Sequence, residues 1–539
     1  MTDLWWKNAV IYGIDIERFM DGNGDGRGDF VGLTSKLPYI AGLGVNCIWL
    51  LPFYPSAERD NGYDIADYFR VDSRYGTFED FLAFVHAAGE HGIRIVIDLV
   101  AQHTSTHHPW FQSARHDPRS PFRDYYVWSD HPPKPPPGKD TMFPGEEDGV
   151  WTFDEVAQSY YHHRFYSFQP GLNHRNPAVL AEIERVTDFW MSFGISGFRI
   201  DAASHLIENP LDPQGQTDPG HSILRDIYRH VVKRMPDAVV LGEVDEDEST
   251  LKTFFDGDQM NMMFNFFLDN YLLLALAQEE AAPLREALAR LPPPPPNGQW
   301  ANFLRNLDEA DLERLDPDEM AAVLAEFAPK EDMRIFGRGI RRRIAPMLGD
   351  ARKLRMAWSL LFSLPGAPVI CYGDEIGMGE DLTRQGRNAV RTPMQWSAGR
   401  NGGFSAAGKG RLPQPMVERG PFSCRAVNVE AQRDDPDSLL ALVRKLAELR
   451  RTHPAIGIQD CQILGAFDRV FVHAYKGPDE ELVALHNLSG KRESVDVELD
   501  AVSSREAEIL LGTGIPVPKQ GRLAFALEPY GFAWLKWTR

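Results

Sequence analysis

Three β-rich runs of this 539-residue sequence carry carboxylic side chains at or near their ends. Asp201 closes the run Gly-Phe-Arg-Ile-Asp, Glu243 closes Leu-Gly-Glu, and Asp308 lies in Phe-Leu-Arg-Asn-Leu-Asp-Glu. A carboxylate can act as a nucleophile, and a carboxylic acid can donate a proton to a leaving group. A single acid at a strand end more often caps a helix or forms an ion pair. Three of them in equivalent places favour one shared catalytic site.

Eight β-rich runs alternate with segments of helical periodicity, which is the pattern of parallel strands joined by crossover helices. In a closed barrel of this kind, the carboxyl ends of the strands gather at one face and carry the site. The sequence therefore predicts an α/β fold, a (β/α)8 TIM barrel, with a doubly wound open sheet as the alternative. The runs are residues 9–15, 45–51, 93–100, 197–201, 239–243, 261–265, 300–306 and 369–372.

Two parts of the chain depart from this alternation. Residues 104–173 are irregular, aromatic and rich in proline, and they are too many for an ordinary connecting loop. We predict a small inserted domain there, after the third strand. Residues 456–539 show strand-like runs without helices, which predicts a C-terminal antiparallel β-sandwich domain. The barrel would then comprise residues 1–103 and 174–455.

The composition limits the classes of partner. With 57 Lys and Arg against 77 Asp and Glu, the formal charge is −20, which disfavours nucleic acid and anionic membranes as partners. Small neutral ligands are the expected partners, no organic cofactor is expected, and a homo-oligomer is possible. Four scattered cysteines without CxxC spacing predict reduced thiols in a cytoplasmic protein. No apolar run reaches the roughly 18 residues that a membrane span requires.

The three acidic segments resemble those that define the α-amylase family of glycoside hydrolases. Residues 62–64, 98–103 and 366–377 are similar to further motifs of that family, so that the resemblance covers almost the whole chain. It implies a retaining enzyme that acts on short α-glucosides such as maltose or trehalose. Retention requires a carboxylate nucleophile on one face of the sugar and a protonated acid at the leaving oxygen, roughly 5 to 5.5 Å apart.

By this resemblance, Asp201 is the nucleophile that forms a covalent glucosyl intermediate, and Glu243 is the acid/base. Glu243 must keep its proton near neutral pH, and a neighbouring ionised Asp201 favours this. Asp308 would bind sugar hydroxyls and stabilise the transition state. Arg199 precedes Asp201 by two residues and shares its side of the strand, so it would hold the nucleophile ionised.

The resemblance also implies residues that bind the substrate. Tyr63 would stack on the apolar face of a glucose ring, while Asp64 and His103 would form hydrogen bonds with its hydroxyls. His205 would lie beside the leaving sugar. Without the resemblance, His103 would be read as an ordinary buried histidine.

Residues 386–396 resemble the arginine-rich loop of α-glucosidases and trehalose synthases. The resemblance implies that Arg387 pairs with Asp64 and closes the pocket behind one glucose, with Arg391 at the neighbouring subsite. Two surface arginines on a polar loop are the alternative.

The segment Asp-Gly-Asn-Gly-Asp-Gly-Arg-Gly-Asp from residue 21 to residue 29 places oxygen ligands at alternate positions, with glycines that permit a tight turn. It predicts a structural calcium or magnesium site. The segment lacks the glutamate of an EF-hand but resembles the first-strand loop of the oligo-1,6-glucosidase branch of the family. A metal-free turn is the alternative. The predicted ligands are Asp21, Asn23, Asp25, Arg27 and Asp29.

Residues 169–173 are similar to a signature of the oligo-1,6-glucosidase branch. Trehalose synthases, which isomerise maltose and trehalose, are most similar to this chain in residues 151–154, 160–165, 298–306 and 339–346. Departures from this pattern occur near the expected pocket. Leu307 replaces the usual histidine, whose hydrogen bond to the sugar is worth about 1.5 to 3 kcal/mol. The residues after Asp201 and around Glu243 also differ. We therefore expect a hydrolase or transglucosidase first, an isomerase second, and a sugar-binding homologue with impaired catalysis third.

Overall fold

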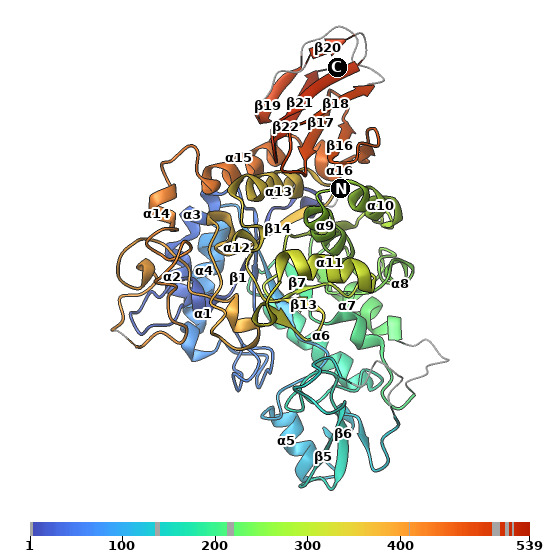
Figure 1. Cartoon of the computed structure of the whole chain (residues 1–539). Coiled ribbons are helices and arrows are strands. Elements are labelled where there is room, and N and C mark those ends of the chain that lie inside the picture. The colour runs from blue at the N-terminus through green and yellow to red at the C-terminus, as the bar shows by residue number, and fades with distance from the viewer. Residues whose placement is uncertain are drawn as a thin grey trace.

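A closed barrel of eight parallel strands forms the centre of the molecule in the computed structural model (Figure 1). Its spatial order is β1-β14-β10-β9-β8-β7-β3-β2, which confirms the predicted TIM barrel and excludes the open sheet. The strands are β1 (Ile11–Ile14), β2 (Cys47–Leu50), β3 (Arg94–Leu99), β7 (Gly197–Ile200), β8 (Val239–Gly242), β9 (Met262–Phe264), β10 (Gln299–Asn302) and β14 (Ala367–Cys371). The structure describes residues 4–134, 141–212, 220–408, 410–498, 507–512, 517–519 and 522–538, so part of the proline-rich segment, 135–140, lies outside it.

Each predicted run overlaps one barrel strand, although β10 and β14 begin one and two residues before their runs, and the strands are almost entirely buried. Parallel strands covered on both faces need continuous apolar sequence, as in Cys-Ile-Trp-Leu of β2. β10 ends at Asn302, earlier than predicted, and Asp308 therefore lies on the loop beyond it. The principal surrounding helices are α2 (Phe30–Ser35), α3 (Leu37–Gly42), α4 (Phe78–Glu90), α6 (Pro177–Met191), α7 (Gly220–Arg234), α8 (Glu248–Phe254), α9 (Phe266–Gln278), α10 (Ala282–Arg290), α11 (Pro317–Phe327), α12 (Ile344–Leu348), α13 (Ala351–Ser363) and α15 (Leu439–Thr452).

A small lobe follows β3 and projects from one end of the barrel (Figure 1). It contains α5 (Pro109–His116) and an antiparallel sheet with the order β4-β6-β5, formed by Trp128–Ser129, Ser159–His162 and Trp151–Asp154. Phe111 holds the helix to this sheet, because its ring packs against Tyr126, Trp128 and Tyr161. The aromatic composition of this segment therefore supplies the lobe with its own core.

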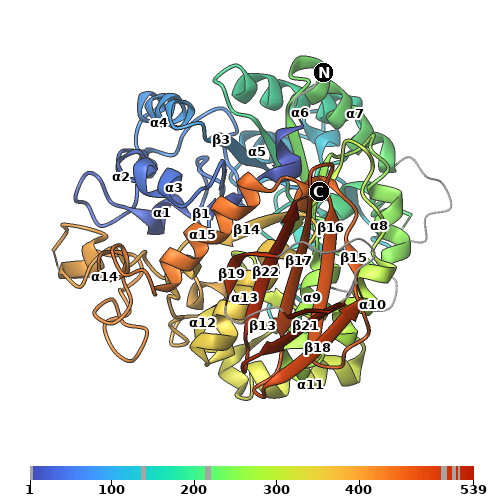
Figure 2. The same cartoon turned by 90° about the horizontal axis from the view of Figure 1, so that it is seen from above.

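Two antiparallel sheets lie over the opposite end of the barrel (Figures 1 and 2). Apolar side chains of both sheets, such as Leu485 and Phe525, form a separate buried core, as expected of a β-sandwich. The first sheet has the order β15 (Gln462–Ile463), β16 (Val470–Lys476), β17 (Glu480–Asn487), β22 (Phe532–Thr538), β19 (Glu508–Gly512), and the second β18 (Glu493–Glu498), β21 (Arg522–Leu527), β20 (Val517–Lys519).

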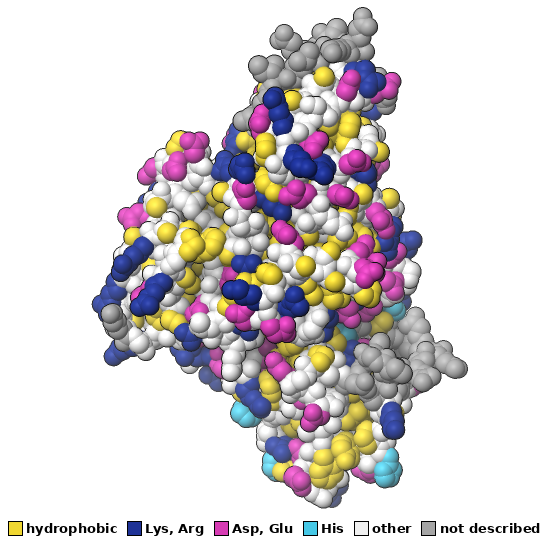
Figure 3. Space-filling model, in the orientation of Figure 1, with side chains coloured by type: hydrophobic (Ala, Val, Ile, Leu, Met, Phe, Trp, Pro, Cys, Tyr) yellow, Lys and Arg dark blue, Asp and Glu magenta, His cyan; other side chains and the backbone are white. Residues whose placement is uncertain are grey.

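Charged side chains of both signs are interspersed over the face shown in Figure 3. The excess of negative charge is therefore not gathered into one patch on this face. Over the described ranges, no helix is both long enough and apolar enough to cross a bilayer.

Two fully buried histidines lie where the C-terminal sheets meet α13. Nε2 of His473 contacts the carbonyl oxygen of Ser363 at 2.9 Å, and Nε2 of His486 contacts Oγ of Ser359 at 2.9 Å. The two rings stack with centroids 5.9 Å apart, and neither Nδ1 atom has a hydrogen-bond partner. Burial lowers the pKa of His473 to about 4 and that of His486 well below its ordinary value.

We expect this contact to make the protein sensitive to acid. The unfolded chain binds protons near pH 6.5, whereas the buried rings resist them, so the free energy of unfolding should fall as the pH drops from about 6.5 towards 4. His473 alone would account for roughly 3 kcal/mol at the lower limit. Urea unfolding between pH 7.5 and 4.5 tests this. The double variant His473→Gln/His486→Gln should lose part of the pH slope, and His91→Gln, at an exposed position, should keep all of it. Equal slopes in all three proteins would contradict the expectation.

Candidate active site

A pocket of about 380 Å³ opens at the carboxyl ends of the barrel strands, next to the inserted lobe. This volume lies within the range of small-molecule sites. Phe143 and Phe165 of the lobe form part of its wall, and Phe266 at the start of α9 forms another part. The structure brings seven of the predicted site residues together in this wall: Tyr63, His103, Asp201, His205, Glu243, Asp308 and Arg387.

Arg199, from β7, joins the two predicted reacting carboxylates beneath the pocket. Its Nη1 lies 2.7 Å from Oδ1 of Asp201, and its Nη2 lies 2.7 Å from Oε2 of Glu243. The same Nη1 is 2.5 Å from Oδ1 of Asp98, at the end of β3, and donates to the hydroxyl of Tyr63 at 3.2 Å. One guanidinium group therefore fixes the nucleophile candidate and the acid/base candidate relative to each other.

Three carboxylates share this single arginine, which leaves the cluster with excess negative charge. Burial raises the pKa of Asp98 to about 6, although Arg199 opposes the rise. Burial also raises the pKa of Asp201 well above its ordinary value, with Glu243 and Asp98 adding to the effect and Arg199 opposing it. These shifts favour a proton on Asp98 or Asp201 in the site without substrate, whereas a retaining mechanism requires Asp201 to be ionised when it attacks the sugar.

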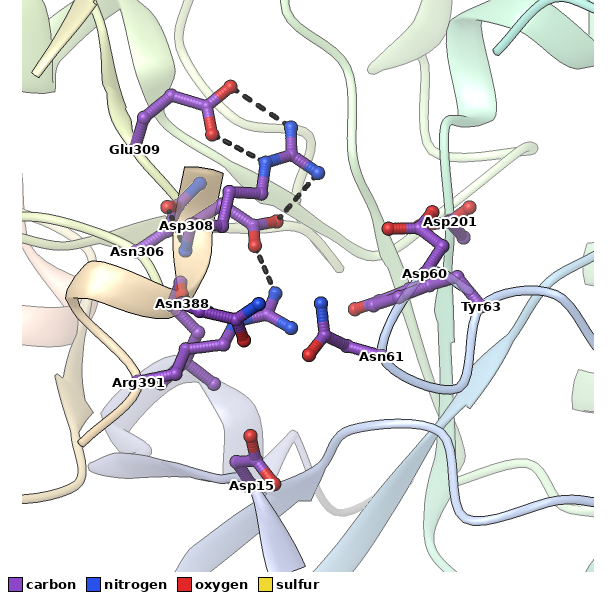
Figure 4. Close-up of polar contacts among 12 residues, drawn as sticks. Asp15, Asp60, Asn61, Tyr63, Asp201, Asn306, Asp308, Glu309, Asn388 and Arg391 are labelled. Atoms are coloured by element: carbon purple, nitrogen blue, oxygen red, sulfur yellow. Dashed lines mark hydrogen bonds and ion pairs between the residues drawn. The ribbon is translucent and has the colours of Figure 1, made fainter. Parts of the chain in front are cut away.

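Asp308 differs from the other two acids in its surroundings. Burial by itself would raise the pKa of this carboxyl group, but Arg387, Arg391 and Arg199 outweigh burial and hold the pKa at about 2. Arg391 contacts Oδ1 of Asp308, and Nη1 of Arg387 lies 3.8 Å from Oδ2 (Figure 4). Asp308 is therefore ionised at any pH at which the protein would work.

The predicted pairing of Arg387 with Asp64 is wrong. Arg387 forms a bidentate pair with Glu309, with Nε–Oε2 and Nη2–Oε1 distances of 2.6 and 2.9 Å (Figure 4). Asp64 is fully buried, and its carboxylate accepts hydrogen bonds from the backbone amides of Arg59 and Asp60. The carboxylate therefore stabilises the turn before Tyr63 and does not face the pocket.

Asp60 lines the pocket where Asp64 had been expected, and Figure 4 shows it beside Tyr63 and Asp201. Sequence reasoning missed this residue because the motif places two aspartates only four positions apart. The run Asp-Asn-Gly before Tyr63 was the available signal, because it is typical of a turn that can present its first side chain outward.

The two predicted histidines both reach the pocket wall. His103 contacts Oε1 of Gln102 and the carbonyl oxygen of Tyr63 at 3.0 and 3.1 Å, and burial lowers its pKa to about 4, so it is neutral near pH 7. His205 contacts Oε1 of Glu208 at 3.0 Å. Arg391, in contrast, lies behind the wall, where it is 2% exposed and supports Asp308.

Leu307 fills the position of the family histidine with an apolar side chain that is 3% exposed. It packs near Gly13 of β1, since a β-carbon at Gly13 would lie 3.2 Å from Cδ1 of Leu307 and 3.0 Å from the ring of Trp49. The small residue at position 13 therefore leaves room for the leucine, which belongs to the buried core next to the pocket residues Asn306 and Asp308 and does not itself line the pocket.

We expect Leu307→His to raise kcat/KM for an α-glucoside substrate by roughly one decade or more, because a hydrogen bond to the sugar would be restored. Leu307→Met, of similar volume but without a donor, should leave the rate unchanged. Thermal unfolding of both variants is measured alongside, since the imidazole enters an apolar contact. A folded histidine variant without any gain would mean that the pocket binds a sugar that offers no partner at this point.

The glycine-rich loop of residues 21–29 brings the carboxylates of Asp21 and Asp29 together. Both accept the backbone amide of Asn23 at 3.1 Å. Asp29 also caps α2 through Gly32, and the side chain of Arg27 pairs with Glu17, so Arg27 could offer an ion only its carbonyl oxygen. The convergence of two carboxylates fits an oxygen-liganded cation, which stays a prediction.

Chelation is expected to destabilise the protein if this loop holds calcium. At a free calcium concentration 100 times the Kd, binding would add about 2.7 kcal/mol to the free energy of unfolding. Differential scanning calorimetry with excess EGTA, and again after calcium is restored, measures the change. Asp21→Asn should remove the contribution of this loop to the change in Tm on chelation. A Tm of the native protein that does not change with EGTA would exclude the site.

Comparisons with known proteins agree with this geometry. Residues 13–458 match the family model described as the α-amylase catalytic domain. The chain is 39% identical to the trehalose synthase/amylase TreS of Mycobacterium tuberculosis, over 99% of this chain and 90% of that protein. It is 41% identical to the trehalose synthase of Thermus thermophilus, over 99% of this chain and 55% of that protein.

Solved structures resemble the whole chain as well. The α-amylase of H. orenii superposes with a TM-score of 0.80 at 27% identity, covering 98% of this chain and 99% of that one. The trehalose-6-phosphate hydrolase of Bacillus licheniformis gives a TM-score of 0.79 at 26% identity, covering 99% of this chain and all of that one.

Proposed function

Because the chain belongs to the α-amylase family of glycoside hydrolases and transglucosidases, we propose that it transfers the glucosyl group of short α-glucosides, such as maltose or trehalose, to water or to another sugar. The observation that carries this proposal is the contact of Arg199 with both Asp201 and Glu243 at 2.7 Å. It holds a nucleophile and an acid side by side at the bottom of a pocket of sugar size.

The reaction would proceed in two displacements. A carboxylate oxygen of Asp201 attacks the anomeric carbon, while Glu243 gives its proton to the departing glycosidic oxygen. Glu243 then removes a proton from the incoming water or sugar hydroxyl, which attacks the same carbon and frees Asp201. Ionised Asp308 would offset the positive charge that develops on the sugar ring in both steps.

The far end of the pocket supports action on a terminal glucose. Asp60 and Arg387 both line the wall, and Glu309 fixes Arg387 there through two contacts. A charged wall of this kind would hydrogen-bond the outer hydroxyls of one glucose and leave no passage for a longer chain.

Isomerisation of maltose to trehalose is the second candidate. The full-length similarity to trehalose synthases favours it. Isomerisation requires the released glucose to stay enclosed and re-attack before water does. The charged residues Asp245 and Glu246 line the pocket just after Glu243. Contacts of these residues with the released sugar would favour its re-attack over attack by water.

Product analysis separates these activities. The purified protein is incubated with maltose and, separately, with trehalose, and glucose, trehalose and longer oligosaccharides are resolved by chromatography. Free glucose or longer glucosides would support hydrolysis or transfer, and interconversion of the two disaccharides with little glucose would identify the isomerase. Absence of turnover on either sugar would reject both and favour a sugar-binding homologue without useful catalysis.

A further inference from the structure

A second group of carboxylates lies in the pocket wall, apart from Asp201, Glu243 and Asp308. Asp245 follows β8 by three residues, Asp311 lies on the short strand β11 (Ala310–Asp311), and Glu313 lies two residues beyond the end of that strand. All three line the pocket. One carboxylate oxygen from each lies within 4.8 Å of the other two, a spacing that a single oxygen-liganded cation could bridge.

Two arginines offset only part of this charge. Nε of Arg314 lies 3.0 Å from Oδ1 of Asp245, and Nε of Arg338 lies 2.9 Å from Oδ2 of Asp311. Both arginines also lie near Glu313, whose Oε2 is 3.4 Å from Nη2 of Arg314 and 3.5 Å from Nε of Arg338. The first contact lacks hydrogen-bond geometry, because the Arg314 and Asp245 atoms both remain without a hydrogen-bond partner. Asp245 therefore keeps a buried, unsatisfied oxygen in the group.

A fourth carboxylate, Asp269, lies behind these three on α9. It is 3% exposed and its Oδ1 has no hydrogen-bond partner. Phe266, three residues earlier and on the same face of the helix, lines the pocket, which gives Asp269 the same general direction. The next residue, Asn270, donates its side-chain amide to the carbonyl oxygen of Asp311 at 2.9 Å, so this part of α9 packs against β11. The carboxylates of Asp245 and Asp311 add to the effect of burial in raising the pKa of Asp269, which agrees with that direction.

Asp245, Asp311 and Glu313 thus share two guanidinium groups, which leaves these five side chains with a formal charge of −1. Behind them, the buried carboxylate of Asp269 adds negative charge, which Arg305 opposes. A buried carboxylate without a partner is costly unless a proton or a cation neutralises it. We propose that Asp245, Asp311 and Glu313 bind one hard divalent cation, Ca²⁺ or Mg²⁺, in the pocket wall, with Asp269 as the buried counter-charge behind it. The ion would tie the loop that carries Glu243 to the loop that carries Asp308.

Calcium stoichiometry of the full-length protein tests this site without any sugar or activity. Protein freed of metal with chelator is titrated with CaCl₂ by isothermal calorimetry at pH 7, up to about 10⁻³ M, where the weaker protein calcium sites fill. Asp245→Asn should weaken or abolish one binding event by at least tenfold in Kd. Asp21→Asn, in the glycine-rich loop, and Asp332→Asn, at an exposed position, should both retain that event.

Terbium luminescence in the unmutated protein provides a second measurement that needs no variant. Tb³⁺ bound in this wall should be sensitised by nearby aromatic rings and displaced by Ca²⁺. An unchanged calcium isotherm in a folded Asp245→Asn protein would overturn the proposal and assign the charge balance to bound protons. Because the readout is cation binding, it can fail while the glucosyl transfer proposed above stands, and the reverse also holds.

Discussion

Glu243→Gln is expected to lower kcat on maltose by roughly 10²- to 10⁴-fold, because the departing sugar alkoxide would no longer receive a proton. The first step with a 2,4-dinitrophenyl α-glucoside should keep most of its rate in this variant, because the phenolate leaves without protonation. The glucosyl group should then accumulate on Asp201, because no base activates the incoming water. Intact-protein mass spectrometry of the variant with this substrate should show a covalent hexosyl adduct.

Two further variants make this result specific. Asp201→Asn should form no adduct and should be inactive on both substrates, because it lacks the nucleophile. Glu326→Gln, at an exposed position on α11, should match the native rates. If Glu243→Gln instead lost activity on the activated glucoside and on maltose to the same degree, Glu243 would not be the proton donor. The assignment of Asp201 and Glu243, the pair joined by Arg199, would then have to be revised.

Asp308→Asn is expected to reduce kcat by about 10²- to 10³-fold with a smaller change in KM, because the charge on this carboxylate counts most when the sugar ring becomes positive. Arg387, Arg391 and Arg199 hold its pKa at about 2, so the carboxylate is present throughout the working range. A fall in native activity between pH 6 and 4 should therefore persist in this variant with the same midpoint, measured as kcat/KM.

Asp60→Asn is the matched variant for that test. Asp60 lines the same pocket and would contact hydroxyls that do not change charge in the reaction, so it should raise KM more than it lowers kcat. Should the two variants show the same pattern, Asp308 would act in binding alone, and its proposed effect on the transition state would be wrong.

The barrel could be predicted because each of its strands overlaps a short β-rich run of the sequence. Runs such as Cys-Ile-Trp-Leu in β2 must be apolar on both faces. At β7, a β-rich run leads directly to Asp201. Glu243 could be placed at a strand end on the same basis, and it does follow β8 directly. Asp201 and Glu243 thus belong to the part of the site that strand ends determine, whereas Asp308 lies on the loop beyond β10.

The contacts between loops could not be predicted in this way. Arg387 pairs with Glu309, which is 78 positions away in sequence. The spacing of the two residues along the chain does not indicate that they are in contact. The choice between Asp60 and Asp64 depended on the course of one turn. The role of Arg199 as a partner of Glu243, in addition to Asp201, required the spatial order of β7 and β8.

Figure 1 shows the C-terminal sheets and the inserted lobe at opposite ends of the barrel, and the pocket adjoins the lobe through Phe143 and Phe165. A support or a fused protein attached through those sheets would leave the mouth of the pocket facing the medium, since the whole depth of the barrel separates them. Capture from the side of the inserted lobe would instead bring the attachment against Phe143 and Phe165, which form the pocket wall. The end from which the chain is held would therefore decide how freely a substrate reaches an immobilised preparation.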